Sequence, residues 1–416
     1  MVTIFPIPRA LVPVDSDAAR RISAPNYDEF QGDREIWDAI RSAPESVLSI
    51  TMAHCAVSDL AHKLEGDSDE SLALATTNLA RLRSLPLTRE VERTLFVYEI
   101  TDPRRPEVRQ IGLGGMARTA EIRTEAVPDG PIIRNEGVRP LKARGRARLI
   151  EATQAIIGTV NNAVPDRTGA LVEALERHAD GQDPCVEVEG AGDTKHRIWL
   201  VGEPGTVTRF QQLLSQESEA YVADGNHRSA AAAMLGHETF LAVFFPAGRM
   251  GISPYNRLVR IPGREPQEEI EAALAASFDV MEGPSREPIQ PNATHEIALY
   301  TPAAGWLRAR PKPTSYDAAD AAASIDHDIV QRTLFERLGI RDAGDDRLTF
   351  VGANKDAAWL QAEVDAGSAE MAVTLPAVTM EQFISVCRQG RMMPPKSTWF
   401  EPKIRSGLVM ALVGKG

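Results

Sequence analysis

The sequence has few cysteines, few aromatic residues and less positive than negative charge. Its 416 residues include 3 cysteines, 6% aromatic residues, and 46 basic against 58 acidic side chains, a formal net charge of −12. Cys55, Cys185 and Cys387 lie far apart and form no Cys-x-x-Cys pair, so neither a disulfide framework nor a zinc knuckle is supported. Because nucleic acids and membrane surfaces are polyanions, a chain this acidic is a poor general binder of either.

Long apolar segments are lacking too. No run approaches the roughly 18 apolar residues that a membrane-spanning helix requires, and the N-terminus lacks the basic start and apolar core of a signal peptide. Together with the cysteine content, this predicts a cytoplasmic protein. The remaining composition, 43% hydrophobic and 25% charged residues, is that of an ordinary globular protein. The length predicts two or three domains.

The first 130 residues predict an α+β domain. Acidic residues open an amphipathic helix at 67–83, and the aromatic and β-branched run at 95–100 is typical of a strand. Residues 108–116 are expected to pair with that strand, and the short apolar run at 47–51 is predicted to be another strand. Within this region, Gly112–Met116 is rich in glycine but lacks the dinucleotide-binding spacing, and we interpret it as a turn.

Residues 131–262 predict a mixed α/β core, because helix and strand signals alternate there. The expected helices are 146–157, 170–178, 207–215 and 229–235, and the expected strands are 185–188, 197–201, 220–223 and 240–245. The Pro262-Gly263 pair predicts a boundary, followed by a C-terminal α+β domain. Its expected helices are 269–277, 325–338 and 380–389, and its expected strands are 297–300 and 306–308. Prolines, aromatics and lysines at 391–403 favour an ordered loop.

The most distinctive local motif is Asp224-Gly-Asn-His-Arg-Ser229, here called the glycine turn. Gly225 permits a close backbone approach and unusual dihedral angles. The first amides of a helix have no intrahelical acceptor and lie where the helix dipole favours an anion, and Arg228 and His227 add side-chain donors. The motif therefore predicts a phosphate-binding turn. The alternative is an Asp-Gly turn before an ordinary capped helix.

A basic segment begins at Arg134-Asn-Glu136 and runs to Arg148. Lys142 and Arg146 are four residues apart and share one helix face if the helix begins that early. We interpret the segment as facing the same anion as the glycine turn. Glu136, isolated among cations, is then a carboxylate available as a base. The alternative is a solvated basic face.

A third motif is Pro394-Pro-Lys-Ser-Thr398, here called the lysine turn. Its lysine and two hydroxyls suit a carboxylate or phosphate group, and the alternative is a rigid proline turn. Asp326-His-Asp328 and His54-Cys55 have no partner at a metal-binding or catalytic spacing. We interpret the first as an acidic helix N-terminus and the second as core residues.

Together these motifs resemble one family. Asp224–Arg228 resembles the Asp-Gly-His-His-Arg motif of ParB-like domains, and the combination is similar to the bacterial family called domain of unknown function 1015 (DUF1015). The further segments that carry this resemblance along most of the chain are Pro6–Ala10, Ala24–Asp28, Arg134–Glu136 with Lys142 and Arg146, Pro254–Arg257, and Met393–Phe400.

The family is similar in turn to archaeal free-serine kinases, which phosphorylate the hydroxyl of free serine with ADP as donor, and related bacterial enzymes use ATP. The resemblance implies a mixed α+β fold with a ParB/sulfiredoxin-like core at 131–262. It also implies additional α+β domains at 1–130 and 263–416. The C-terminal domain would contribute a substrate-binding loop at 393–403.

The resemblance also implies roles for individual residues. Glu136 would be the base and Asp224 a second catalytic carboxylate, acting through magnesium. ATP or ADP would be held by Gly225, Asn226, His227, Arg228, Ser229, Lys142 and Arg146, and the substrate by Lys396, Ser397 and Thr398.

The sequence departs from the family pattern at three positions. Asn135 and Asn226 replace histidines, and Ser229 replaces the usual aromatic residue. Asn226 still contributes a backbone amide, so the glycine turn keeps its donors. Sulfiredoxin activity requires a cysteine in this turn, and the sequence has none there, which excludes that activity.

The sequence therefore predicts a small-molecule kinase that transfers phosphate from ATP or ADP to a serine-like amino acid or a related hydroxy acid. The expected partners are the nucleotide and this small substrate, and neither nucleic acid nor membrane. Two alternatives stay open: a nucleotide-binding regulatory protein without kinase activity, and a nucleotide hydrolase.

Overall fold

The computed structural model describes residues 1–262, 266–342 and 344–413, and its contacts divide the chain into two compact units. The first unit combines residues 1–134 and 138–250 with the segment from Pro402 on, and the second combines 135–137 with 251–401. The expected domain boundaries at 130 and 262 stay predictions; Gly263 itself lies outside the described residues. The mixed α+β class is confirmed.

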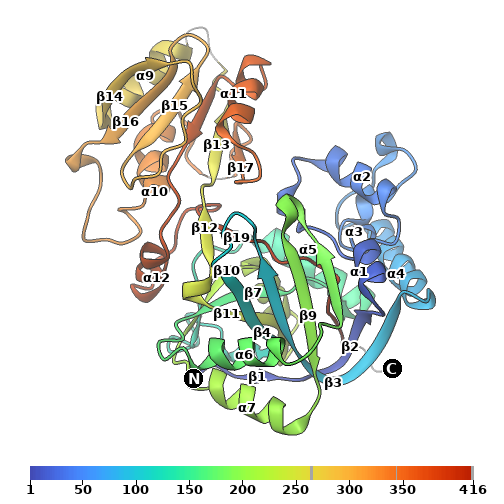
Figure 1. Ribbon diagram of the computed structural model, residues 1–416. Coiled ribbons are helices and arrows are strands. Elements are labelled where there is room, and N and C mark those ends of the chain that lie inside the picture. The colour runs from blue at the N-terminus through green and yellow to red at the C-terminus, as the bar shows by residue number, and fades with distance from the viewer. Residues whose placement is uncertain (263–265, 343, 414–416) are drawn as a thin grey trace. The chain divides into compact units, whose positions relative to one another are not determined.

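A 12-stranded sheet forms the framework of the first unit (Figure 1). Its main path is β5 (Ile132–Arg134), β10 (Ala220–Asp224), β7 (Val160–Val164), β11 (Thr239–Pro246), β4 (Arg109–Arg118), β3 (Thr88–Thr101), β2 (Ile7–Pro13), β20 (Met410–Leu412) and β6 (Ala155–Ile156). Three strands branch from it: β1 (Ile4–Phe5) on β4, β9 (Lys195–Val201) on β3, and β8 (Val186–Glu189) on β9. Strands from the first 130 residues and from the predicted core therefore share one sheet.

The strand predicted at 108–116 is confirmed, but the turn predicted at Gly112–Met116 is wrong, because these residues lie in the middle of β4. A β-carbon on Gly114 would collide with the ring of Phe96, and one on Gly112 would lie 2.6 Å from the ring of Phe245. The glycines are therefore explained by the bulky rings that pack over the strand, rather than by a need for a turn.

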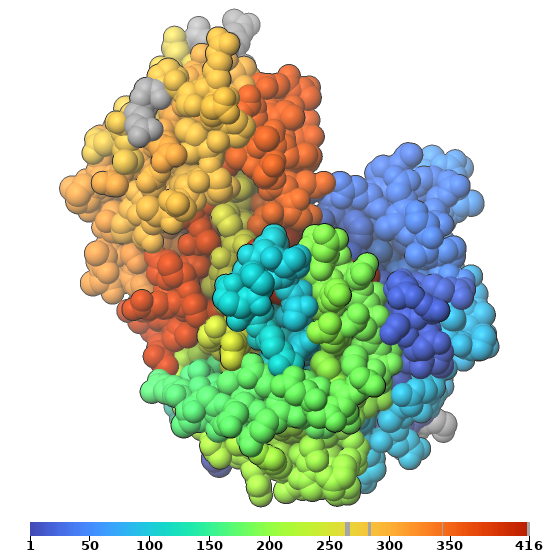
Figure 2. Space-filling model, in the orientation of Figure 1, coloured from blue at the N-terminus to red at the C-terminus, as the bar shows by residue number. Residues whose placement is uncertain are grey.

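Helices cover this sheet and pack into two clusters of buried apolar side chains. In chain order they are α1 (Ser16–Ile22), α2 (Asp33–Ser42), α3 (Leu48–Thr51), α4 (Asp69–Ser84), α5 (Pro140–Thr153), α6 (Ala170–Asp180), α7 (Pro204–Leu214) and α8 (Asn226–Met234). The N-terminal helices, blue in Figure 2, form a continuous part of the first unit's surface in that view.

The strand predicted at 47–51 is wrong, because this run forms α3. Val47, Leu48 and Ile50 are all buried in the cluster that the N-terminal helices form with β20. A short apolar run that is buried on all sides has no readable period, so its composition alone does not separate helix from strand.

The helix predicted at 146–157 is correct in type but shifted in position. Pro140 opens α5, as the fixed φ of proline favours at a first helical turn. The helix stops at Thr153, where Gln154 takes a left-handed φ of 51°, and the chain enters β6 directly. Lys142 and Arg146 therefore do lie one turn apart on the same helix.

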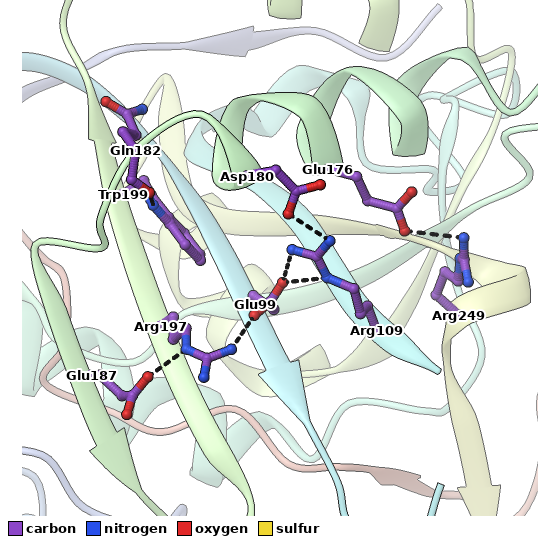
Figure 3. A network of polar contacts seen from close by, with 9 residues as sticks. All are labelled: Glu99, Arg109, Glu176, Asp180, Gln182, Glu187, Arg197, Trp199 and Arg249. Carbon is purple, nitrogen blue, oxygen red and sulfur yellow. Dashed lines mark hydrogen bonds and ion pairs between the residues drawn. The ribbon is translucent and has the colours of Figure 1, made fainter. Parts of the chain in front are cut away.

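A buried carboxylate ties together three strands of the sheet. Glu99 on β3 is 1% exposed and accepts hydrogen bonds from Arg109 Nε on β4 (2.6 Å) and Arg197 Nη1 on β9 (2.8 Å). Figure 3 shows Glu99 between the two guanidinium groups, with Asp180 and Glu187 as their outer partners. The charged groups of this network are paired with one another, so we interpret the network as structural.

The second unit is built on a six-stranded antiparallel sheet in the order β14 (Phe278–Ser285), β16 (Gly305–Pro311), β15 (Ile297–Thr301), β18 (Met371–Thr374), β13 (Asn256–Val259) and β17 (Leu348–Val351). A separate pair joins β12 (Gly251–Ser253) to β19 (Trp399–Glu401), and the helices are α9 (Pro266–Ser277), α10 (Asp326–Val330), α11 (Ala357–Asp365) and α12 (Met380–Arg388). Thr379 caps α12 as predicted.

The single helix predicted at 325–338 is wrong in detail. Asp326 opens α10, which agrees with the acidic N-terminus expected there, and its carboxylate accepts the His295 amide. The chain then widens into a π-helix at Gln331–Phe335 before Gly339 turns it with a φ of 75°. Among the described residues, no helix combines the length and the apolar character needed to cross a bilayer.

Candidate functional site

The glycine turn is the connection between β10 and α8, and the strand–turn–helix prediction is confirmed. Gly225 has a φ of 104°, a left-handed conformation that disfavours any side chain. The first hydrogen bond of α8 runs from Ser229 N to Gly225 O over 3.0 Å. The amides of the preceding first turn point along the helix axis, where the helix dipole favours a negative charge.

Several side chains of the glycine turn serve the local fold. Ser229 is fully buried, and its hydroxyl donates to the carbonyl oxygen of Asn226 over 3.0 Å. The Nε2 atom of His227 accepts the Arg139 amide over 3.1 Å, which joins the turn to the start of α5. These contacts fix the turn.

Arg228 has the most unusual environment in the glycine turn. Its side chain packs against Gly158 and Gly225, where a β-carbon would lie 2.8 Å and 2.9 Å from it, respectively. Its Nε and Nη2 are buried and find no hydrogen-bond acceptor among the described residues. Nη2 has one ion-pair partner, Asp224 Oδ2, at 3.3 Å. A buried guanidinium that lacks acceptors is costly, so this geometry favours an anionic ligand.

Two residues that the sequence reasoning did not select complete this charge cluster. The ammonium of Lys403 lies 3.3 Å from Asp28 Oδ2 and 3.8 Å from Asp224 Oδ2. Asp28 is the middle residue of η1 (Tyr27–Glu29), and Lys403 lies in the C-terminal segment that belongs to the first unit from Pro402 on. The segment Ala24–Asp28 carried part of the family resemblance, which was the available signal for Asp28.

Arg146 from α5 adds a second arginine to the cluster. It stacks 4.8 Å over the Tyr27 ring, and its Nη1 has a 3.4 Å hydrogen bond to the carbonyl oxygen of Thr51. Burial lowers the pKa of the Arg146 guanidinium, and the neighbouring charge of Arg228 lowers it further. Because both guanidinium groups line one cavity, their like charges favour an anionic ligand there.

Side chains of this cluster line two cavities. Arg146, Arg228 and Tyr27 line a narrow cavity of about 60 Å³ that is otherwise mostly apolar. Arg146 and Tyr27 also line a large cavity of about 620 Å³, together with Lys142 and His227. The volume of the large cavity is within the range of small-molecule sites, which is about 300–1,000 Å³.

Glu136 belongs to the second unit, where it contacts the lysine turn. It forms a parallel β-bridge with Met393, and its Oε2 accepts the backbone amide of Lys396 over 3.3 Å. Lys396 has a left-handed φ of 61°, and its ammonium lies 5.5 Å from the centre of the Tyr255 ring. The structure therefore brings Glu136 and Lys396 together, although 260 positions separate them.

A buried arginine supports this second group. Arg257 Nη2 donates to the carbonyl oxygen of Lys396 over 2.9 Å, and the guanidinium stacks 4.5 Å over the Phe350 ring. Burial lowers the pKa of Arg257 to about 9, while the charge of Glu136 acts in the opposite direction. Ser397 is 2% exposed and donates its hydroxyl to Pro394 O over 2.7 Å, so its hydroxyl stabilises the turn.

The predicted residues thus fall into two groups. Asp224, Arg228 and Arg146 cluster in the first unit, and Glu136 and Lys396 in the second. The convergence of these two groups around one substrate stays a prediction.

Comparisons with known proteins agree with the resemblance seen in the motifs. The family model described as "Protein of unknown function (DUF1015)" matches residues 5–334. No curated protein sequence matches the chain.

Several solved structures are distantly similar. A conserved hypothetical protein from Pyrococcus furiosus has 16% identity and a TM-score of 0.36, with 67% of this chain and 92% of that chain covered. A free serine kinase in complex with AMP has 14% identity and a TM-score of 0.38, covering 67% and 89%. SbnI with a C-terminal truncation, from Staphylococcus aureus, has 13% identity and a TM-score of 0.37, covering 68% and 86%. Similarities of this size do not identify an activity.

Proposed function

The chain belongs to the DUF1015 family, and from that premise we propose that it is a phosphotransferase acting on a small molecule. It moves a phosphoryl group from ATP or ADP to the hydroxyl of a serine-like amino acid or a related hydroxy acid. The observation that carries the proposal is the pair of largely buried arginines, Arg146 and Arg228, on one narrow cavity beside the glycine turn.

The donor's phosphates fit this arrangement of charge. Arg228 contributes buried N–H groups without acceptors, and α8 contributes its N-terminal dipole. Arg146 adds a second guanidinium whose fork geometry matches phosphate oxygens. The large cavity, which shares Arg146 with the narrow one, has the volume for the rest of the nucleotide.

Asp224 has a narrower role than the family resemblance implies. It is already neutralised by Arg228 at 3.3 Å and by Lys403 at 3.8 Å. We therefore assign Asp224 and Asp28 to holding Lys403 and Arg228 in place, rather than to binding magnesium. Magnesium that enters with the nucleotide would neutralise charge that develops during phosphoryl transfer.

Glu136 and the lysine turn bind and activate the phosphoryl acceptor in this proposal. The carboxylate of Glu136 is the group on this side that can accept a proton from a hydroxyl. Lys396 and the hydroxyl of Thr398 would bind the acceptor's carboxylate. As the acceptor oxygen bonds to phosphorus and the bridging P–O bond breaks, Glu136 takes the hydroxyl proton and Arg228 balances the leaving charge.

Nucleotide binding tests the donor half of this proposal. Isothermal titration calorimetry with ADP and a non-hydrolysable ATP analogue should show binding that Arg228→Ala weakens by at least about tenfold. Arg209→Ala, an exposed arginine on α7, is the matched control and should bind like the wild type. Equal affinity of all three proteins would remove Arg228 from the site.

Phosphoryl transfer tests the whole proposal. The protein is incubated with magnesium and ATP or ADP against a panel of hydroxy-amino acids and hydroxy acids, and ³¹P NMR follows the products. A phosphorylated acceptor supports the kinase. Phosphate release that no acceptor accelerates favours a nucleotide hydrolase, and tight binding without turnover favours a regulatory protein; either result rejects the kinase.

A further inference from the structure

A second cluster of reactive side chains lies in the N-terminal part of the first unit. Asp33, His54 and Cys55 each offer one ligand atom, and these three atoms lie within 4.8 Å of one another. His54 and Cys55 sit in η2 (Ala53–Cys55), and Asp33 is the first residue of α2. The sequence shows only the His54-Cys55 pair, because Asp33 reaches it through the packing of α2 against η2.

We propose that Asp33, His54 and Cys55 bind a divalent transition-metal ion, preferably Zn²⁺. A carboxylate, an imidazole and a thiolate are the ligand types that zinc prefers. Bond lengths of about 2.0–2.3 Å in a tetrahedral site place ligand atoms roughly 3.3–3.6 Å apart. Asp33 Oδ1 and His54 Nε2 are 3.6 Å apart, too far for a hydrogen bond but suited to ligands that share an ion.

The surroundings hold two of the ligands in place. Asp33 Oδ2 contacts the Lys63 ammonium at 2.5 Å, and this bond lowers the pKa of Asp33 and leaves Oδ1 directed to His54. The carbonyl oxygen of His54 accepts the Leu64 amide over 3.1 Å, which fixes η2 from the other side. Outer partners of this kind orient metal ligands and are part of most metal sites.

The position of the cluster gives the ion an open side. Asp33 and His54 both line the large cavity, whereas Cys55 is fully buried behind them. An ion held by three protein ligands at a cavity wall has a fourth position for water or a ligand, as in catalytic rather than structural zinc sites. The proposal is independent of phosphoryl transfer, since none of these three residues has a role in it.

The competing interpretation is a core cluster without metal, in which Asp33 pairs with the Lys63 ammonium and lies 3.6 Å from His54 Nε2. Burial and the charge of Asp33 raise the pKa of the Cys55 thiol to about 11, which is compatible with a plain buried cysteine. Lys63 is half-exposed, with 51% of its side chain accessible, so it can move away from an incoming ion. The two interpretations differ in what happens when metal is added.

Cobalt titration separates them. Co²⁺ added to the metal-stripped full-length protein should give intense visible d–d bands and a near-ultraviolet thiolate-to-cobalt band, saturating at one equivalent and reversed by Zn²⁺. Cys55→Ser should abolish the thiolate band, and His54→Gln should weaken binding by at least about tenfold. Cys185→Ala, which removes a thiol remote from the cluster, should titrate like the wild type.

The outcomes decide the proposal without reference to kinase activity. Circular dichroism of each variant shows whether it is folded, and His54→Gln, at a partly exposed position, remains informative if Cys55→Ser is not. A wild-type protein with no thiolate band at millimolar Co²⁺ overturns the proposal. So does a thiolate band that persists in folded Cys55→Ser, or Co²⁺ affinity that His54→Gln leaves unchanged.

Discussion

The ammonium of Lys403 lies 3.3 Å from the carboxylate of Asp28, which precedes it by 375 positions in the chain. The same ammonium lies 3.8 Å from Asp224 at the end of β10. One cation therefore neutralises two carboxylates that lie far apart in the sequence, directly beside the glycine turn. Its position makes it part of the proposed phosphate site as well as of the fold.

Lys403→Met should destabilise the protein by about 3 kcal/mol. The side chains of Lys403 and Asp28 are only 9% and 10% exposed, and removing one partner of a buried ion pair leaves an uncompensated charge. Urea denaturation measures the change in the free energy of unfolding. The double variant Asp28→Asn/Lys403→Met should recover part of the loss, and a purely additive double variant would show that the two side chains do not interact.

Glu136→Gln should lower kcat by roughly two orders of magnitude or more, because the amide cannot accept the acceptor's proton. The amide oxygen can still accept the Lys396 amide, so the lysine turn keeps its geometry. The affinity for nucleotide should change little, since Glu136 contributes nothing to donor binding. Steady-state kinetics measures kcat, and calorimetry measures the affinity for nucleotide. Unchanged kcat would remove Glu136 from the mechanism.

Glu29 should make stability depend on pH near neutrality. Burial, followed by the charge of Asp28, raises the pKa of Glu29 from 4.5 to about 7. The folded state therefore holds this proton more tightly than the unfolded chain. This difference in pKa contributes up to about 3 kcal/mol to the free energy of unfolding. The contribution is fully present below pH 4.5 and is lost as the pH rises through about 7.

Glu29→Gln tests this dependence, because glutamine is neutral at every pH and can still accept the Asn26 amide that Glu29 accepts over 2.8 Å. Urea denaturation at pH 5 and pH 8 should show the variant gaining stability relative to the wild type at pH 8. A wild-type-minus-variant difference that is the same at both pH values would contradict the raised pKa.

Gly114→Ala should destabilise the first unit by about 1–3 kcal/mol. Its new methyl group would collide with the ring of Phe96, and both residues lie in the buried centre of the sheet. Thermal unfolding followed by circular dichroism measures the loss. Gly202→Ala, where nothing lies within 4 Å of the added β-carbon, should have little effect. The double variant with Phe96→Leu should be less affected than Gly114→Ala alone.

The sequence predicted best those features that depend on neighbouring residues. The turn at Gly225 and the capping of α12 by Thr379 follow from local chemistry, and both are confirmed. The α3 helix at Leu48–Thr51 was mistaken for a strand because its burial on all sides removes the alternation that distinguishes the two.

Features that depend on distant partners could not be predicted in the same way. Gly112 and Gly114 are explained only once Phe245 and Phe96, respectively, are known to pack against them. Lys403 had no signal of its own, because its two carboxylates lie far away in the sequence. Asp33 likewise joins His54 only through tertiary packing.

The short strand β20 constrains the order in which the first unit can form. Residues 410–412 pair with β2 on one side and with β6 on the other. During synthesis, all of the second unit emerges from the ribosome before these three residues do. Until then β2 and β6 present uncovered strand edges, which are prone to mispairing between nascent chains. Truncation just before residue 410 should therefore promote aggregation, even though it leaves the proposed catalytic residues intact.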